Sequence, residues 1–173
     1  MMNVTLSNLE KQASSENFLL RVQVRRPLNF WTLRLVVGTY ISPTRIKLLG
    51  EMKGWAYAGF NGLQLDTMKV SDDAPQCVGH LIWASTMAWA IESTPCRNTR
   101  LLAINDEPFQ HTKLVRYFRK RGFETIKQVG SAPIDLPLRL VWGGAGTLMK
   151  AECINVYNRS LRLWDRYREQ KDF

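Results

Sequence analysis

The sequence predicts an α/β sandwich, because strand patterns and helix patterns alternate along most of the chain. Residues 20–25 alternate apolar and polar side chains, as a half-buried strand does. Residues 77–93 form a longer, nearly continuous apolar segment of helix length. The composition is that of a globular protein, with 45% hydrophobic and 23% charged residues among 173. This balance excludes a wholly disordered chain.

The first half is expected to begin with an unpacked segment. Residues 1–17 have no apolar periodicity and contain a Ser-Ser-Glu-Asn cluster, which predicts a mobile N-terminal arm before one domain over residues 18–173. Ser42-Pro43 is a turn signal, after which apolar residues recur at helical spacing. The expected elements are strands at 18–26 and 30–41, a helix from Pro43 to Ala58 and a strand at 63–70.

The second half carries clearer boundary signals. Pro108 is typical of the first helical turn, and Gly122 is typical of the residue that ends a helix in the left-handed conformation. The glycine-rich segment Gly143–Gly146 is expected to be a turn after a strand or a loop that contacts a substrate. The expected elements are helices at 77–93, 108–121 and 151–170, and strands at 100–104, 123–129 and 138–142.

Charge and cysteine content limit the classes of partner. There are 24 Lys and Arg against 15 Asp and Glu, a net charge of +9, which favours nucleic acid, acidic protein, anionic lipid or a phosphorylated cofactor. Three cysteines without C-x-x-C spacing predict a reducing compartment, and no metal site is expected. No apolar stretch is long enough for a transmembrane segment. We expect a cytoplasmic protein, with association at a membrane surface left open.

The segment Gln76–Leu81 (QCVGHL) follows an expected strand and opens an expected helix. Free backbone N–H groups at such a point, together with the positive end of the helix dipole, can bind a phosphate. An ordinary strand–loop–helix turn, with Gly79 allowing close packing, is the simpler explanation. His80 is likewise either a base beside this loop or a packing residue.

The order of these elements resembles the latter half of the GNAT acyl-CoA N-acyltransferase superfamily. The matching stretches are 68–90, with the Gln-x-x-Gly loop, and 101–124, with Asn at the strand end and a closing Gly-Phe. The resemblance implies a GNAT-like three-layer sandwich, with a mixed central sheet flanked by helices and an atypical N-terminal half. It also implies a site for acetyl-CoA or another acyl-CoA. The residues that would line this site are Gln76, Val78, Gly79, His80, Leu81 and Asn105.

Two departures from the family pattern predict weak or absent catalysis. Leu81 stands where the family has a small residue, so its side chain would crowd a pyrophosphate. Phe118 stands where the family often has a tyrosine acid, and Tyr117 is one position away, roughly 100° round the helix and expected to point elsewhere. Tyr117 is therefore the one candidate acid. The whole C-terminal pattern is similar to an uncharacterised GNAT-like family of cyanobacteria and chloroplasts.

Basic residues gather on two expected helices. A solvated helix face is the simpler explanation of such a charge pattern. The more specific explanation is docking to an acidic protein, to an anionic membrane surface or to RNA. The residues expected to bind the partner are Lys113, Arg116, Lys120, Arg162 and Arg166.

Three functions remain open. The first, which the resemblance implies, is a GNAT-fold accessory or assembly factor of photosynthetic machinery that binds an acidic protein complex with little or no catalysis. The second is an acetyl-CoA-dependent N-acetyltransferase acting on an amine or a protein lysine. The third is a basic module associated with nucleic acid, although no RNP, KH or helix-turn-helix pattern supports it.

Overall fold

The computed structural model describes residues 5–105, 108–142 and 144–171. None of the helices in these ranges is long and apolar enough to cross a membrane. The elements are, in chain order, α1 (Leu6–Ser15), β1 (Phe18–Arg25), β2 (Phe30–Ser42), β3 (Arg45–Tyr57), β4 (Leu63–Val70), α2 (Gln76–Ser93), β5 (Asn98–Ile104), α3 (Pro108–Arg121), β6 (Glu124–Val129), the short 3-10 turn η1 (Pro133–Asp135), α4 (Leu136–Trp142), β7 (Gly146–Glu152) and α5 (Cys153–Lys171).

The strands form one mixed sheet, which confirms the expected α/β class. Its order is β1-β2-β3-β4-β5-β7-β6, so the last strand of the chain lies between β5 and β6. Every neighbouring pair is antiparallel except β4 and β5. These two run parallel, and their register extends only from Leu63–Thr99 to Leu65–Leu101. Beyond Leu65 and Leu101 the two strands are no longer paired, which opens the sheet between them.

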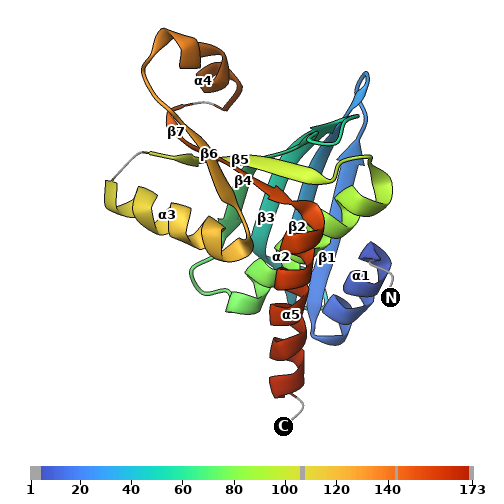
Figure 1. Cartoon of the computed structure of the whole chain (residues 1–173). Coiled ribbons are helices and arrows are strands. Elements are labelled where there is room, and N and C mark those ends of the chain that lie inside the picture. Colours follow the sequence, from blue (N-terminus) through green and yellow to red (C-terminus); the bar gives the residue numbers. More distant parts are fainter. Residues whose placement is uncertain (1–4, 106–107, 143, 172–173) are drawn as a thin grey trace.

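The four longer helices lie on one face of the sheet (Figure 1). α2 is the central helix: it contacts β2, β3 and β4 as well as α1 and α5, while α3 contacts β5 and α5. Trp83 and Met87 of α2 are fully buried, as is Leu35 of β2. The resemblance implied helices on both faces, but over β1–β3 they cover only one. The reason is that β1 and β2 form a direct hairpin, with no helices between them to cover the other face.

The uncovered face over β1–β3 carries a cluster of cations that we call the open sheet face: Arg21, Arg25, Arg34 and Lys53. They belong together because residues paired across neighbouring strands point to the same side. Arg34 is paired with Gln23 in β1 and with Lys53 in β3, and Arg21 and Arg25 flank Gln23 at two-residue spacing. All four are exposed.

The N-terminal segment is packed, so the prediction of an arm without structure is wrong for Leu6–Ser15. The Thr5 hydroxyl accepts a hydrogen bond from the Asn8 N–H, which is a normal N-cap. Leu9 and Ala13, one turn apart, are buried, and α1 contacts β1 and α2. Two buried apolar positions in ten residues are too weak a pattern to predict this helix from sequence.

The segment predicted as a helix from Pro43 to Ala58 is β3, so that prediction is wrong. Its buried residues alternate from Gly50 through Met52 and Gly54 to Ala56. A Cβ on Gly50 would lie 2.6 Å from Ile82 Cδ1 of α2, and a Cβ on Gly54 would lie 2.6 Å from the Gln64 carbonyl of β4. The glycines therefore allow close approach of neighbouring elements, a tertiary requirement that local periodicity does not reveal.

The segment predicted as a strand at 138–142 belongs to α4, and the strand lies later. η1 leads into α4 after Asp135, whose carboxylate accepts hydrogen bonds from the Gly130 N–H and the Lys127 ammonium. Gly143 lies outside the described residues. Gly146 begins β7, where a Cβ would lie only 2.2 Å from the Ala103 carbonyl. The glycine-rich segment thus ends in a strand that enters the sheet, rather than in a turn alone, and α5 begins two residues later than predicted.

Candidate functional site

The start of α2 is where the resemblance places a phosphate. The helix begins at Gln76, directly after Pro75, and has no side-chain cap. The Val78 N–H donates to the Pro75 carbonyl at 3.0 Å. After the first turn of a helix, backbone N–H groups bond to carbonyls within the helix, and this applies to Gly79, His80 and Leu81. Gln76, which was among the predicted residues, and Cys77, which was not, therefore carry the free N–H groups. Asn105 is exposed after β5, with its N–H donating to the Ala145 carbonyl.

A buried arginine lies beside this helix end. Arg121, the last residue of α3, is only 7% exposed. Its Nη2 donates to His80 Nδ1 at 2.9 Å, and its Nη1 donates to Ser160 Oγ of α5 at 3.4 Å. The guanidinium also lies over the Tyr117 ring, 5.2 Å from the ring centre. Arg121 thus joins α2, α3 and α5 through neutral groups, which is an unusual environment for a buried cation.

The Arg121 contact fixes the state of His80. A guanidinium only donates hydrogen bonds, so His80 Nδ1 accepts and the ring is neutral with its proton on Nε2. Burial, and then the positive charge of Arg121, lower the pKa of His80 to about 4. His80 is therefore a neutral acceptor that positions Arg121. Its accepting nitrogen is already occupied, which favours the packing interpretation over a base.

Three side chains border the space in front of Gly79. A Cβ on Gly79 would lie 3.9 Å from the Tyr117 hydroxyl, from Arg121 Nη2 and from Met68 Cε. The Tyr117 hydroxyl accepts a hydrogen bond of 2.9 Å from Trp83 Nε1. The expectation that Tyr117 points away from this region is therefore wrong. Phe118 instead packs edge-on against Trp83 in the core.

The basic residues of α3 and α5 form one surface. We call it the helical basic surface; its members are Lys113, Arg116, Lys120, Arg159, Arg162 and Arg166, all exposed. Arg159 joins the two helices, because its Nη1 donates to the Lys120 carbonyl at 3.4 Å. Within the part of the chain that the structure describes, none of the six is paired with a carboxylate. By contrast, Arg168 and Lys171, also on α5, both pair with Glu16.

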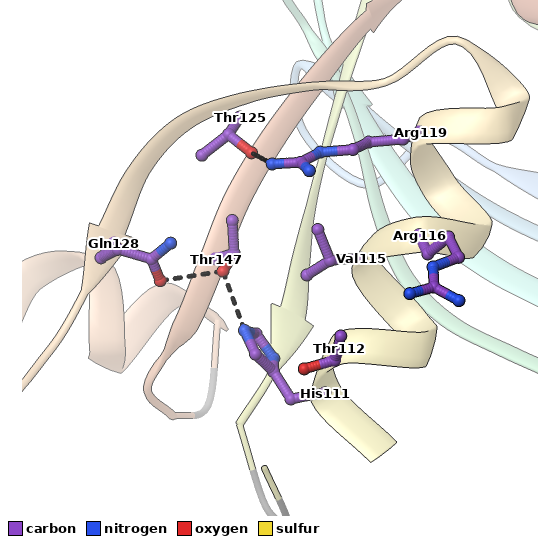
Figure 2. A pocket seen from close by; sticks show the side chains of 8 residues that line it. All are labelled: His111, Thr112, Val115, Arg116, Arg119, Thr125, Gln128 and Thr147. Carbon is purple, nitrogen blue, oxygen red and sulfur yellow. Dashed lines mark hydrogen bonds between the residues drawn. The ribbon is translucent and has the colours of Figure 1, made fainter. Parts of the chain in front are cut away.

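A pocket between α3, β6 and β7 was not predicted (Figure 2). It has a volume of about 260 Å³ and is lined by His111, Thr112, Val115, Arg116, Arg119, Thr125, Gln128 and Thr147. Its wall carries a chain of hydrogen bonds. His111 Nδ1 lies 3.1 Å from the Ile104 carbonyl, His111 Nε2 lies 3.0 Å from Thr147 Oγ1, and Thr147 Oγ1 lies 2.8 Å from Gln128 Oε1. Local sequence gives no signal for this pocket, because β7 itself was not predicted.

The cysteines are structural in their surroundings. Cys77, Cys96 and Cys153 are all buried free thiols. Burial raises the pKa of the Cys77 thiol, and it raises the pKa of Cys153 to about 12. A thiol with a raised pKa is a poor nucleophile at neutral pH. Among the residues that the structure describes, no three His, Cys, Asp or Glu side chains are grouped to hold a metal ion.

Comparison with known proteins identifies no family. No family model matches the chain, and no curated protein matches its sequence. Among solved structures, the chain is similar to an uncharacterized protein (bh2621) from Bacillus halodurans, with a TM-score of 0.47 and 16% identity. The match covers 78% of this chain and 66% of the other.

Proposed function

We propose that the protein is a divergent GNAT-fold adaptor that binds an acidic protein surface through the helical basic surface, with little or no acetyl transfer. The observation that carries this proposal is the arrangement of six exposed cations on two helices that Arg159 connects. Like charges held together repel one another, and an acidic partner removes this repulsion while steering association. A role in photosynthetic machinery stays a prediction of the resemblance alone.

Two features of the sheet support the GNAT part of the proposal. The single parallel pair β4–β5 separates after a short contact, and α2 starts just after β4 ends. An opening of this kind at the carboxyl end of a strand is where open α/β sheets commonly bind ligands. The side chains argue against efficient catalysis there, since Tyr117, Arg121 and Met68 occupy the space in front of Gly79.

An acyl-CoA-dependent N-acyltransferase is the second candidate. It is favoured by the Tyr117 hydroxyl, which lies beside Gly79, and by the Arg121 charge close to the helix end. If the Tyr117–Trp83 pair moved aside, that space would admit a cofactor. Acetyl-CoA at 100 times its dissociation constant would stabilise the protein by ~2.7 kcal/mol. An unchanged melting temperature with acetyl-CoA in excess removes this candidate.

Charge reversal on one face at a time tests the adaptor. The first variant is Lys113→Glu, Lys120→Glu and Arg162→Glu; the matched control is Arg21→Glu, Arg25→Glu and Lys53→Glu on the open sheet face, with the same change in net charge. We expect salt-dependent binding of polyglutamate that the first variant loses and the control retains. If both variants lose polyglutamate binding equally, the binding is not specific to the helical basic surface. The same variants are tested with an RNA oligonucleotide and with anionic vesicles. If one of these binds through the same residues and polyglutamate does not, the partner is RNA or a membrane surface and not an acidic protein.

A further inference from the structure

We propose that the pocket between α3 and the β6–β7 pair binds a small phosphomonoester. This inference goes beyond the proposed adaptor, because it concerns a small-molecule pocket that shares only Arg116 with the helical basic surface. The phosphate would lie between Arg119 and Gln128, with His111 and Thr147 at the base and Arg116 at the rim (Figure 2).

The pocket has positive charge that the described residues do not neutralise. Arg116 and Arg119 lie on the pocket side of α3, and the described lining contains no carboxylate. Arg119 Nη2 makes one long contact of 3.5 Å to Thr125 Oγ1, which leaves most of its donors unused. A guanidinium with free donors is suited to an oxyanion, which it can bind through two parallel hydrogen bonds.

The hydrogen-bond chain on the pocket wall has two self-consistent arrangements. The Ile104 carbonyl only accepts, so His111 Nδ1 carries a proton in both. With a neutral ring, the Thr147 hydroxyl donates to Nε2, and the Gln128 amide must turn so that its NH₂ donates to Thr147. With a protonated ring, Nε2–H donates to Thr147, whose hydroxyl donates to Gln128 Oε1. The Gln128 NH₂ then faces away from Thr147, as Figure 2 shows.

An anion selects the second arrangement. A phosphate accepts hydrogen bonds, so it is bound better when Gln128 presents its NH₂ group. The charged groups that line the pocket with His111 are Arg116 and Arg119 of α3. The neighbouring strands contribute the Ile104 carbonyl, Thr125, Gln128 and Thr147, which are neutral.

The size of the pocket suits a small phosphomonoester. At ~30 Å³ per water-sized group, a volume of about 260 Å³ holds roughly nine such groups. A phosphate group fills about half of them and leaves room for a small organic substituent against Val115. The donors left free in the second arrangement are the guanidinium of Arg119 on α3 and the NH₂ group of Gln128 on β6.

Titration calorimetry of the full chain with glycerol phosphate tests the site. The variant is Arg119→Gln; the matched control is Lys120→Gln, which removes one charge from the same helix outside the pocket. We expect Arg119→Gln to weaken binding by about tenfold or more and Lys120→Gln by less than about twofold. Equal weakening indicates nonspecific attraction and overturns the proposal. Inorganic phosphate is the second probe: binding as tight as that of glycerol phosphate shows a site for free phosphate instead.

The polyglutamate assay separates this proposal from the proposed function. Polyglutamate binding should show the reverse pattern, sensitive to Lys120 and not to Arg119, so the two proposals fail separately.

Discussion

His80 should be the main source of acid sensitivity that a single substitution can remove. In His80→Asn, the side-chain oxygen takes the place of Nδ1 as acceptor for Arg121, and no titratable group remains. The folded protein holds the pKa of His80 at about 4, against 6.5 for an ordinary histidine, because of burial and then Arg121. Between pH 6.5 and pH 4 the unfolded chain therefore binds a proton that the folded protein does not. The stability contributed by His80 is full above pH 6.5 and is lost as the pH falls to about 4.

The size of this effect follows from the two pKa values. A pKa lowered from 6.5 to about 4 corresponds to roughly 3 kcal/mol of free energy of unfolding. The ring is only partly buried, so water screens some of the interaction, and we expect ~2 kcal/mol. Other groups also titrate in this range. One is Glu51, because its hydrogen bond with Arg34 lowers the pKa of its carboxyl group. The informative quantity is therefore the difference between variant and wild type.

Urea denaturation at several pH values between 7 and 4 measures that difference. Wild type should lose ~2 kcal/mol more than His80→Asn across this range, with most of the loss below pH 6.5. His111→Asn removes the only other histidine and controls for the loss of an imidazole as such. It should keep the acid-side loss of the wild type. Parallel curves for wild type and His80→Asn would refute the reasoning, because His80 would then titrate alike in the folded and unfolded states.

Three further predictions concern the fold. Gly146→Ala should lower the free energy of unfolding by ~2 kcal/mol or more, because the added Cβ would clash with the Ala103 carbonyl. Gly144→Ala is the control: an added Cβ there has nothing within 4 Å, so the free energy of unfolding should change by less than about 0.5 kcal/mol. Urea denaturation of the two variants measures the difference. Thr5→Ala should lower the free energy of unfolding by ~1 kcal/mol, because it removes the N-cap of α1, and urea denaturation measures this too. An unchanged free energy of unfolding would mean that α1 is not docked in solution. The buried cysteines should react with a thiol reagent only when the protein unfolds; rapid reaction of Cys77 in the native protein would contradict its burial.

The helices were predictable where their ends carry local signals. The segment from Pro108 to Arg121 is α3 with the predicted bounds, and Gly122 has a φ of +102°, the left-handed conformation expected of a helix stop. β3 was not predictable in this way. Its glycines are weak helix formers, but their function is to let α2 and β4 approach, and that requirement exists only once those elements are placed.

The candidate sites depended on knowledge that local sequence does not contain. The pocket is assembled from α3, β6 and β7, and β7 enters the sheet between two strands that precede it in the chain. Chain order gives no indication of this insertion, so Thr147 could not be placed beside His111. Residues of the helical basic surface were identifiable, because they share one face of each helix. The contact between Arg159 and Lys120 that connects the helices was not.

Arg121 illustrates why a charge count is a poor guide to function. It looks like one more member of a basic helix, yet it follows Leu114 and Tyr117 on the inward face at spacings of seven and four residues. A helical projection therefore carried a signal for its burial. Once buried, the cation requires acceptors, and His80 and Ser160 supply them. The six cations of the helical basic surface face solvent, whereas Arg121 holds three helices together at the expense of acid stability.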